Sequence, residues 1–212
     1  MLEVRSFTFS PVQENTYLLY NAENHCLVID PGCYFGNERR ELQEFIAKYV
    51  LTPKYLLNTH CHLDHVFGND FVHKTYKLDL HIHEKEKIVL DYAPTSGIQW
   101  GLPFENYKGN LLYLKEGDEV KLDTDVLRVI FAPGHSPGHI CFYCEDQGFL
   151  IGGDVLFRES IGRTDLPGGD HATLISSIRS KLFMLPDETV VYPGHGPATT
   201  IGYEKKHNPY LQ

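Results

Sequence analysis

Three histidines and an aspartate lie within the seven residues "THCHLDH", from Thr59 to His65. His60 and His62 are two residues apart, so in an extended segment their side chains project to the same side and can bind one ion. Asp64 and His65 follow at a bend and can face a neighbouring ion. Imidazole nitrogens and carboxylate oxygens suit zinc, iron and manganese. The stretch therefore predicts part of a metal site whose remaining ligands must come from elsewhere.

Three later apolar runs each end in a Gly- or Pro-marked loop with a metal-capable side chain. "LRVIFA" leads to His135, "GFLIGG" leads to Asp154, and "TVVYP" leads to His195. Binding groups are commonly placed on loops that a rigid scaffold holds. Polar loops arising by chance would not need the same residue types at each strand end. We therefore expect these side chains to complete two adjacent metal sites, with the carboxylate of Asp154 able to bridge them.

Short apolar runs alternate with helical patterns along the chain. Strands are expected at residues 4–9, 15–20, 26–30, 54–58, 78–83, 119–123, 126–132, 139–145, 148–153 and 189–193. Helices are expected at 37–49, 69–76, 84–92 and 174–183, with an irregular segment at 92–110 and a short polar end. Each half reads as strands followed by helices, with no linker between the halves. We expect a single domain over residues 1–212, in which two antiparallel-rich sheets pack together with helices outside.

Composition restricts the partners. The formal net charge of −9 disfavours nucleic acid, and no apolar run is long enough for a membrane span. Five cysteines and no export signal favour free thiols and a cytoplasmic location. Cys141 and Cys144 are spaced as C-x-x-C, but on a strand they point to opposite faces, so we expect two packed thiols. The expected partner is a small molecule, with no nucleic acid and no membrane.

The motif set resembles that of the metallo-β-lactamase superfamily over nearly the whole chain. "THCHLDH" matches the family's H-x-H-x-D-H motif, the later His and Asp residues match its ligands in order, and "NTYLL" and "IDPG" match its opening strands. The resemblance implies an α+β fold, the αββα sandwich of two mixed sheets flanked by helices. It implies a first metal on His60, His62 and His135, a second on Asp64, His65 and His195, and Asp154 as the bridge. Asp30 resembles the family's second-shell aspartate that orients a ligand loop; a simple turn-forming role is the alternative.

"GRTDLPGGD" and "PGHGPATTIGYEKKHNPY" look like the small type II glyoxalase branch, the hydroxyacylglutathione hydrolase-like enzymes. This likeness implies a dinuclear metal-dependent hydrolase of a thioester such as S-lactoylglutathione. Two divalent ions are implied, with zinc expected and iron or manganese as alternatives. A metal-bound hydroxide would attack the carbonyl, and Asp64 would orient it and accept its proton. The thiol carrier is left open, because these residues hold no counterpart of the helical glutathione-binding region of full-length type II glyoxalases.

Other interpretations of the same residues stay open. The superfamily includes persulfide dioxygenases with a single iron, as well as hydrolases of lactones and other esters, and a non-enzymatic metal-binding protein is the third class. Arg163 is a candidate substrate contact, with a pair to Asp165 as the alternative. Trp100 is a candidate for a pocket lid, with coverage of the sandwich edge as the alternative. His139 is expected to be a loop or strand-start residue rather than a ligand.

Overall fold

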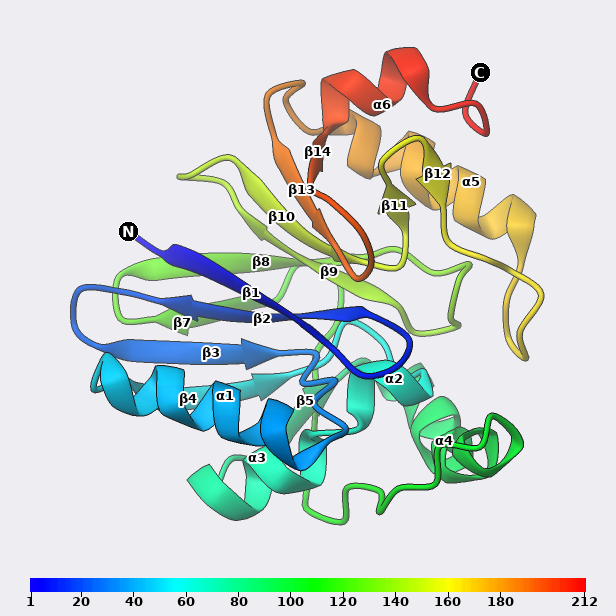
Figure 1. Ribbon diagram of the computed structural model, residues 1–212. Helices are drawn as coiled ribbons and strands as arrows, with labels where there is room; N and C mark the ends of the chain where they lie inside the picture. Colours follow the sequence, from blue (N-terminus) through cyan, green and yellow to red (C-terminus); the bar gives the residue numbers. More distant parts are fainter.

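Two six-stranded sheets lie face to face in the computed structural model, which describes residues 1–212 (Figure 1). The first sheet has the order β1 (Glu3–Phe9), β2 (Glu14–Tyr20), β3 (His25–Ile29), β4 (Thr52–Leu57), β5 (Leu80–Ile82) and β6 (Leu111–Tyr113). Its first three strands are antiparallel, and the pairs from β3 to β6 are parallel. The sheet is therefore mixed, because helical crossovers follow the opening hairpins.

The second sheet is mixed as well. Its order is β14 (Thr199–Thr200), β13 (Val190–Pro193), β10 (Phe149–Gly153), β9 (Ile140–Cys144), β8 (Asp125–Phe131) and β7 (Glu119–Leu122). Only β10 and β13 pair in parallel, because α5 lies between them in the chain. A small hairpin of β11 (Leu156–Phe157) and β12 (Ser160–Ile161) follows β10. β9 and β10 pair antiparallel as a hairpin.

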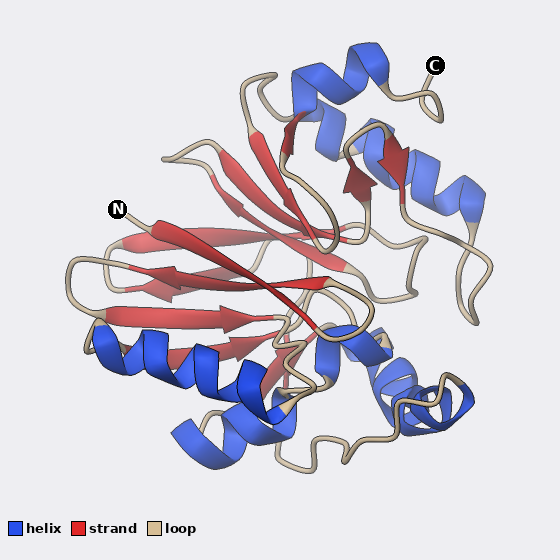
Figure 2. Cartoon of the chain, viewed as in Figure 1, coloured by secondary structure: helices blue, strands red, loops and turns tan.

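Helices cover the two outer faces (Figure 2). The helices are α1 (Gly36–Lys48), α2 (Leu63–Val66), α3 (Asn69–Tyr76), α4 (Lys87–Gln99), α5 (His171–Ser180) and α6 (Ile201–His207), with 3₁₀ turns at Glu84–Glu86 and Leu182–Met184. The first, third and fourth contribute to the core outside the first sheet, and the last two to the core outside the second. The predicted αββα sandwich is confirmed. No helix is long and apolar enough to cross a membrane.

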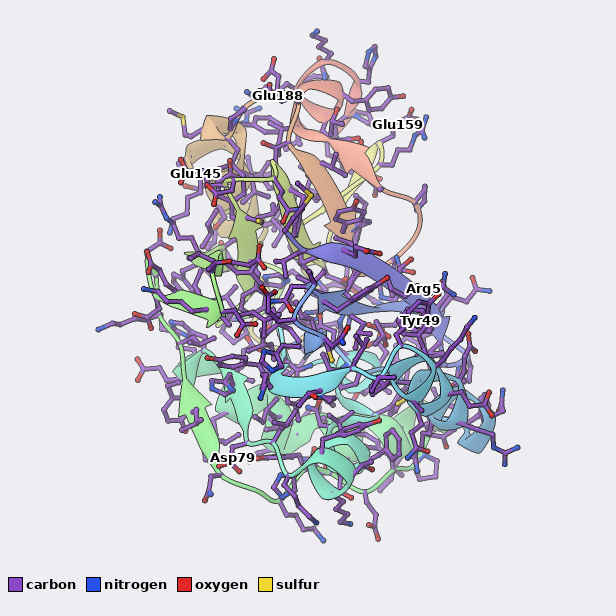
Figure 3. All side chains as sticks on the ribbon, turned by 90° about the vertical axis from the view of Figure 1, so that its left-hand side faces the viewer. Arg5, Tyr49, Asp79, Glu145, Glu159 and Glu188 are labelled. Atoms are coloured by element: carbon purple, nitrogen blue, oxygen red, sulfur yellow. The ribbon has the colours of Figure 1, made fainter.

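Strands buried on both faces supply three cores. Along β2, Leu18 points to the helices and Leu19 points to the second sheet, as the two-residue period of a strand requires. Cys141 lies in the outer core of the second sheet and Cys144 lies between the sheets, so the expected packing of two separate thiols is confirmed. All five cysteines are free and buried. Charged side chains such as Asp79, Glu145, Glu159 and Glu188 project from the surface (Figure 3).

Two sequence predictions about elements are wrong. The segment expected to be irregular from residue 92 is helical up to Gln99, because α4 continues through Pro94. Pro94 has no N–H to donate to the carbonyl of Leu90, four residues earlier. That carbonyl instead accepts a hydrogen bond from the side-chain amide of Asn106 at 2.7 Å. The expected polar end forms β14 and α6, since Thr200 caps that helix through the amide of Tyr203.

Candidate metal centre

The predicted ligands gather where both sheets end on the same side of the sandwich. β4 leads into the segment with His60 and into α2, which carries Asp64. In the second sheet, β8, β10 and β13 lead to His135, Asp154 and His195 respectively. Figure 1 shows α2, the β11–β12 hairpin and the start of α4 along this edge. The structure brings all seven predicted ligands together at the junction of the two sheets.

Three imidazoles form the first cluster, and their ring nitrogens face one another. Nδ1 of His62 lies 2.8 Å from Nε2 of His135, which lies 3.2 Å from Nε2 of His60. Ligand atoms of these three residues all lie within 4.8 Å of one another. A single ion can therefore be held by all three side chains.

Hydrogen bonds on the far sides of the rings set the tautomers. Nδ1 of His135 lies 2.7 Å from the carbonyl of Arg163, which can only accept, so the proton is on Nδ1. Nδ1 of His60 lies 3.1 Å from the Thr59 hydroxyl, whose proton is donated to Asp30 at 2.6 Å. Both Nε2 atoms therefore turn lone pairs toward the cluster. Lone pairs at this separation repel unless a cation lies between them, so the donor set fits a metal ion.

The second cluster consists of Asp64, His65 and His195. Nε2 of His195 lies 3.1 Å from the Asp64 carboxylate, and Nε2 of His65 lies 3.8 Å from it. Nδ1 of His65 lies 3.1 Å from the Asp30 carboxylate. Nδ1 of His195 lies 3.1 Å from the Gln13 carbonyl. Nε2 is therefore the atom that each ring turns toward Asp64. Burial opposes protonation of these rings, but the neighbouring carboxylates raise the pKa of both in the metal-free protein, so an ion bound at Nε2 would replace a proton.

Asp154 lies between the two clusters. One carboxylate oxygen is 3.4 Å from His65, and the other is 3.5 Å from His135 and 3.6 Å from His195. The first of these oxygens and Nε2 of His65 are both buried without a hydrogen-bond partner. Buried polar atoms are rarely left unpaired, and a cation at this point would satisfy both. Asp154 is thus placed to touch two ions.

The charges favour divalent cations. Burial, together with the neighbouring His135, lowers the pKa of His62 to about 3. Burial opposes ionisation of Asp154, but the adjacent His65 outweighs it and holds the pKa of this carboxyl well below its usual range. The pKa of Asp64 is also lowered, by His65 and by the hydrogen bond from His195, although burial opposes this. Neutral imidazoles and ionised carboxylates are the forms that bind metal.

Asp30 holds the segment that carries the ligands through several hydrogen bonds. It accepts hydrogen bonds from the Thr59 amide at 2.7 Å, from the Thr59 hydroxyl, from Asn58 at 3.1 Å and from His65. Both oxygens of the Asp30 carboxylate therefore accept hydrogen bonds from the loop after β4 and from His65. The geometry agrees with the predicted orienting role rather than with a turn alone.

Several supporting residues were missed by the sequence analysis. Glu86 is buried and accepts hydrogen bonds from the amides of Cys61 and Gly138, both at 2.7 Å, so it ties the two loops of the first cluster. Asn15 donates to the carbonyls of Pro193 and Gly196 at 3.0 and 2.9 Å, which fixes the loop of His195. Glu86 lies in the charged run "EKEK", where nothing marks it as buried. For Asn15 the signal was "NTYLL", which indicated only a strand.

Histidine 139 has a supporting place too. It immediately precedes β9, as expected of a strand-start residue, and its Nε2 accepts a hydrogen bond from the Asp154 amide at 3.0 Å. Burial and the neighbouring His135 lower its pKa well below the usual value. Neutral His139 can therefore hold the backbone at Asp154 without adding charge.

A cavity of about 300 Å³ opens onto both clusters. Trp100 and Arg163 line it together with the ligands, so both candidate substrate contacts lie at its walls. The Arg163 guanidinium also forms a two-pronged pair with Asp165, with both distances 2.7 Å. Trp100 is 53% exposed, which is consistent with a position at the rim of the cavity.

Sequence comparison supplies the family. The model of the metallo-beta-lactamase superfamily matches residues 9–195. The chain belongs to this superfamily. Probable metallo-hydrolase YqgX of Bacillus subtilis is 38% identical over 98% of this chain and 96% of that protein. Hydroxyacylglutathione hydrolase GloC of Haemophilus influenzae is 39% identical over 94% of this chain and 93% of that protein.

Solved structures of the superfamily have the same fold. BLEG-1, described as a B3 metallo-beta-lactamase, has a TM-score of 0.90 at 38% identity, covering 99% of this chain and 100% of that one. TTHA1623 in a di-iron-bound form has a TM-score of 0.88 at 37% identity, covering 98% and 100%. ETHE1 from Myxococcus xanthus is more distant, with a TM-score of 0.77 at 27% identity, covering 98% and 83%. Superfamily membership and the His/Asp clusters support a metal-dependent hydrolase.

Proposed function

We propose that the protein is a dinuclear metal-dependent hydrolase of thioesters. The observation that carries the proposal is the convergence of two ligand clusters on Asp154, which has one buried oxygen without a hydrogen bond. His60, His62 and His135 would hold the first ion, and Asp64, His65 and His195 the second. Asp154 would bridge them. Zinc is the expected metal, and the di-iron form of TTHA1623 keeps iron as an alternative.

The chain's own groups then have distinct tasks. When bound, a divalent metal lowers the pKa of water to roughly 7 and polarises a carbonyl. Asp64 would orient the attacking water and accept its proton, since its carboxylate lies in the cavity wall. Asp30 would keep His65 in the tautomer that leaves Nε2 free. Arg163 and Trp100 would contact the substrate at the rim.

A thioester is favoured among the possible substrates. The GloC relative is named as a hydroxyacylglutathione hydrolase, and it aligns with nearly the whole chain. Two carboxylates only partly neutralise two divalent ions, so the cavity suits an anionic substrate. S-lactoylglutathione or a related hydroxyacyl thioester is therefore the first substrate to test. Lactones and other esters need the same attack on a carbonyl and belong in the same panel, together with a β-lactam because of BLEG-1.

The second candidate is a mononuclear-iron persulfide dioxygenase, because the first histidine cluster and Asp154 could also hold a single iron. Its iron would be held by Asp154 and histidines of the first cluster. One iron per chain, with oxygen uptake on a persulfide and no thioester hydrolysis, is the result that would replace the hydrolase proposal.

The Asp154→Asn variant tests the bridge. An amide keeps the shape of the carboxylate but removes its charge and one acceptor oxygen. We expect loss of the second ion, measured as metals per chain, and a fall of at least a hundredfold in thioester hydrolysis, in line with the loss of electrostatic stabilisation at an active site. Asp146→Asn, at an exposed turn, is the control and should keep both. Two ions and full activity in Asp154→Asn would refute the assignment.

A further inference from the structure

A second cavity, of about 400 Å³, adjoins the metal centre. It lies between α4 and the loops that carry Pro137 and Pro167. The two cavities have His62, Leu63 and Leu166 in common. The second cavity therefore lies beside the first metal cluster.

The wall formed by α4 is apolar along one side of the helix. Ile88, Tyr92 and Ser96 are four residues apart and share one face, with Val89 and Ala93 beside them. Ile88 is 73% exposed at the rim of the cavity. The helix thus presents apolar surface toward the space beside His62.

No Asp, Glu, Lys or Arg lines this cavity. Its polar groups are His62, the Ser96 and Tyr92 hydroxyls and the Cys61 thiol. A carboxylate or phosphate placed here would lose water without gaining a counter-charge. An apolar group would instead bury surface on both sides of the contact.

We propose that this second cavity binds the apolar acyl group of the thioester, which makes acyl chains longer than lactoyl the preferred substrates. The inference rests on the proposed thioesterase function. Common thiol carriers of the glutathione type bear charged groups, which an uncharged cavity excludes. The cavity over the metal centre contains Arg163 and can accept that charged arm.

The volume indicates the size of the acyl group. At about 30 Å³ per water-sized unit, a cavity of 400 Å³ holds roughly a dozen heavy atoms. A lactoyl group has about five heavy atoms and would leave most of this space to water. A medium-length alkyl chain or a phenyl-substituted acyl group fills it.

Two series of thioesters test which arm enters the cavity. In the first, the thiol is N-acetylcysteamine and the acyl group runs from acetyl through butyryl and hexanoyl to octanoyl. In the second, the acyl group is acetyl and the thiol grows by the same steps. We expect kcat/KM to rise about three- to fourfold per methylene in the acyl series, and to stay within a few-fold in the thiol series. A rise in the thiol series alone would overturn the assignment.

Variants of α4 locate the effect. Ser96→Phe should fill the cavity, so that kcat/KM for octanoyl falls at least tenfold while acetyl changes less than twofold. Thr95→Phe is the matched control, since Thr95 is exposed on the same helix and does not line the cavity. Ile88→Ala, at an exposed position that tolerates change, should reduce the octanoyl rate several-fold. Unchanged acyl preference in both Ser96→Phe and Ile88→Ala would refute the proposal.

A binding measurement separates this inference from the hydrolase proposal. The S-octyl thioether of N-acetylcysteamine cannot be hydrolysed, and calorimetry can follow its binding to the metal-free protein. Binding that Ser96→Phe abolishes and Thr95→Phe preserves supports the apolar cavity, even if no thioester is turned over and the hydrolase proposal fails. Hydrolysis of acetyl and lactoyl thioesters with no gain from longer chains and no thioether binding would leave the hydrolase proposal standing and overturn the cavity assignment.

Discussion

The hydrogen bond on the outer nitrogen of an imidazole determines which nitrogen faces the metal site. His135 donates to a backbone carbonyl, so it turns an unprotonated nitrogen inward. His60 reaches the same state through Thr59. His65 lies beside the Asp30 carboxylate, which leaves its Nε2 facing the second cluster. Such partners raise ligand basicity and fix the orientation of each ring.

Asp30 is the residue on which most of this orientation depends. We expect Asp30→Asn to weaken binding of the second metal by about 10- to 100-fold and to lower the free energy of unfolding by about 1–3 kcal/mol. The φ angle of Asp30 is 49°, a conformation that asparagine also adopts, so the backbone should be unchanged. Metal titration and urea unfolding check both effects. Asp123→Asn, at an exposed aspartate with φ 56°, is the control; equal effects in both variants would refute the role of Asp30.

Acid sensitivity of the metal-free protein follows from His62. Its pKa is about 3 in the folded protein, chiefly through burial and then through His135, and near 6.5 when unfolded. Between these values only the unfolded chain takes up the proton at this residue, so the contribution of His62 to stability falls as the pH drops below about 6.5. We expect His62→Gln to remove up to about 1.4 kcal/mol per pH unit from this slope. Urea unfolding at pH 4–7 with a chelator present is the measurement, and identical slopes would contradict the assignment.

At the scale of elements, helix α4 contains a proline and also forms a wall of the second cavity. Pro94 removes one helical hydrogen bond, and the Asn106 amide replaces it at the Leu90 carbonyl. The loop after α4 is thereby attached to the helix that forms the wall of the second cavity. This contact couples the position of α4 to a loop that does not touch the metal ligands.

A double-mutant cycle tests this coupling. Asn106→Ala should destabilise the protein by about 1–2 kcal/mol, since it leaves the Leu90 carbonyl without a partner. In Pro94→Ala, the new amide can bond the same carbonyl, so adding Asn106→Ala should then cost much less. Thermal or urea unfolding of the four proteins gives the coupling energy. Additive effects of the two substitutions would show that the amide of Asn106 does not replace the missing helical bond.

The same scale shows what sequence patterns can and cannot predict. β2, β3, β9 and β10 were predictable because strands buried on both faces are short apolar runs. The extension of α4 was not, because its proline is compensated by a side chain 12 residues away. The seven candidate ligands could be found because they lie in four segments that each follow a strand. Glu86 and Asn15 could not, because their partners are backbone groups that only the tertiary fold brings near.

In the whole molecule, the metal centre lies where the two halves of the chain meet. His60, His62, Asp64 and His65 come from the first sheet's side, and His135, Asp154 and His195 from the second. Neither sheet alone holds a full set for either ion, since His135 completes the first cluster and His195 the second. Bound metals would therefore join the sheets as well as serve the reaction.

Titration of the metal-free protein with Zn²⁺, while hydrolysis of a thioester is followed, tests the central claim most directly. The ligand sets predict that the rate reaches its maximum at two ions per chain, that a chelator abolishes it, and that added Zn²⁺ restores it. A rate that is already maximal at one ion per chain, or no hydrolysis at any loading, would contradict the dinuclear thioesterase.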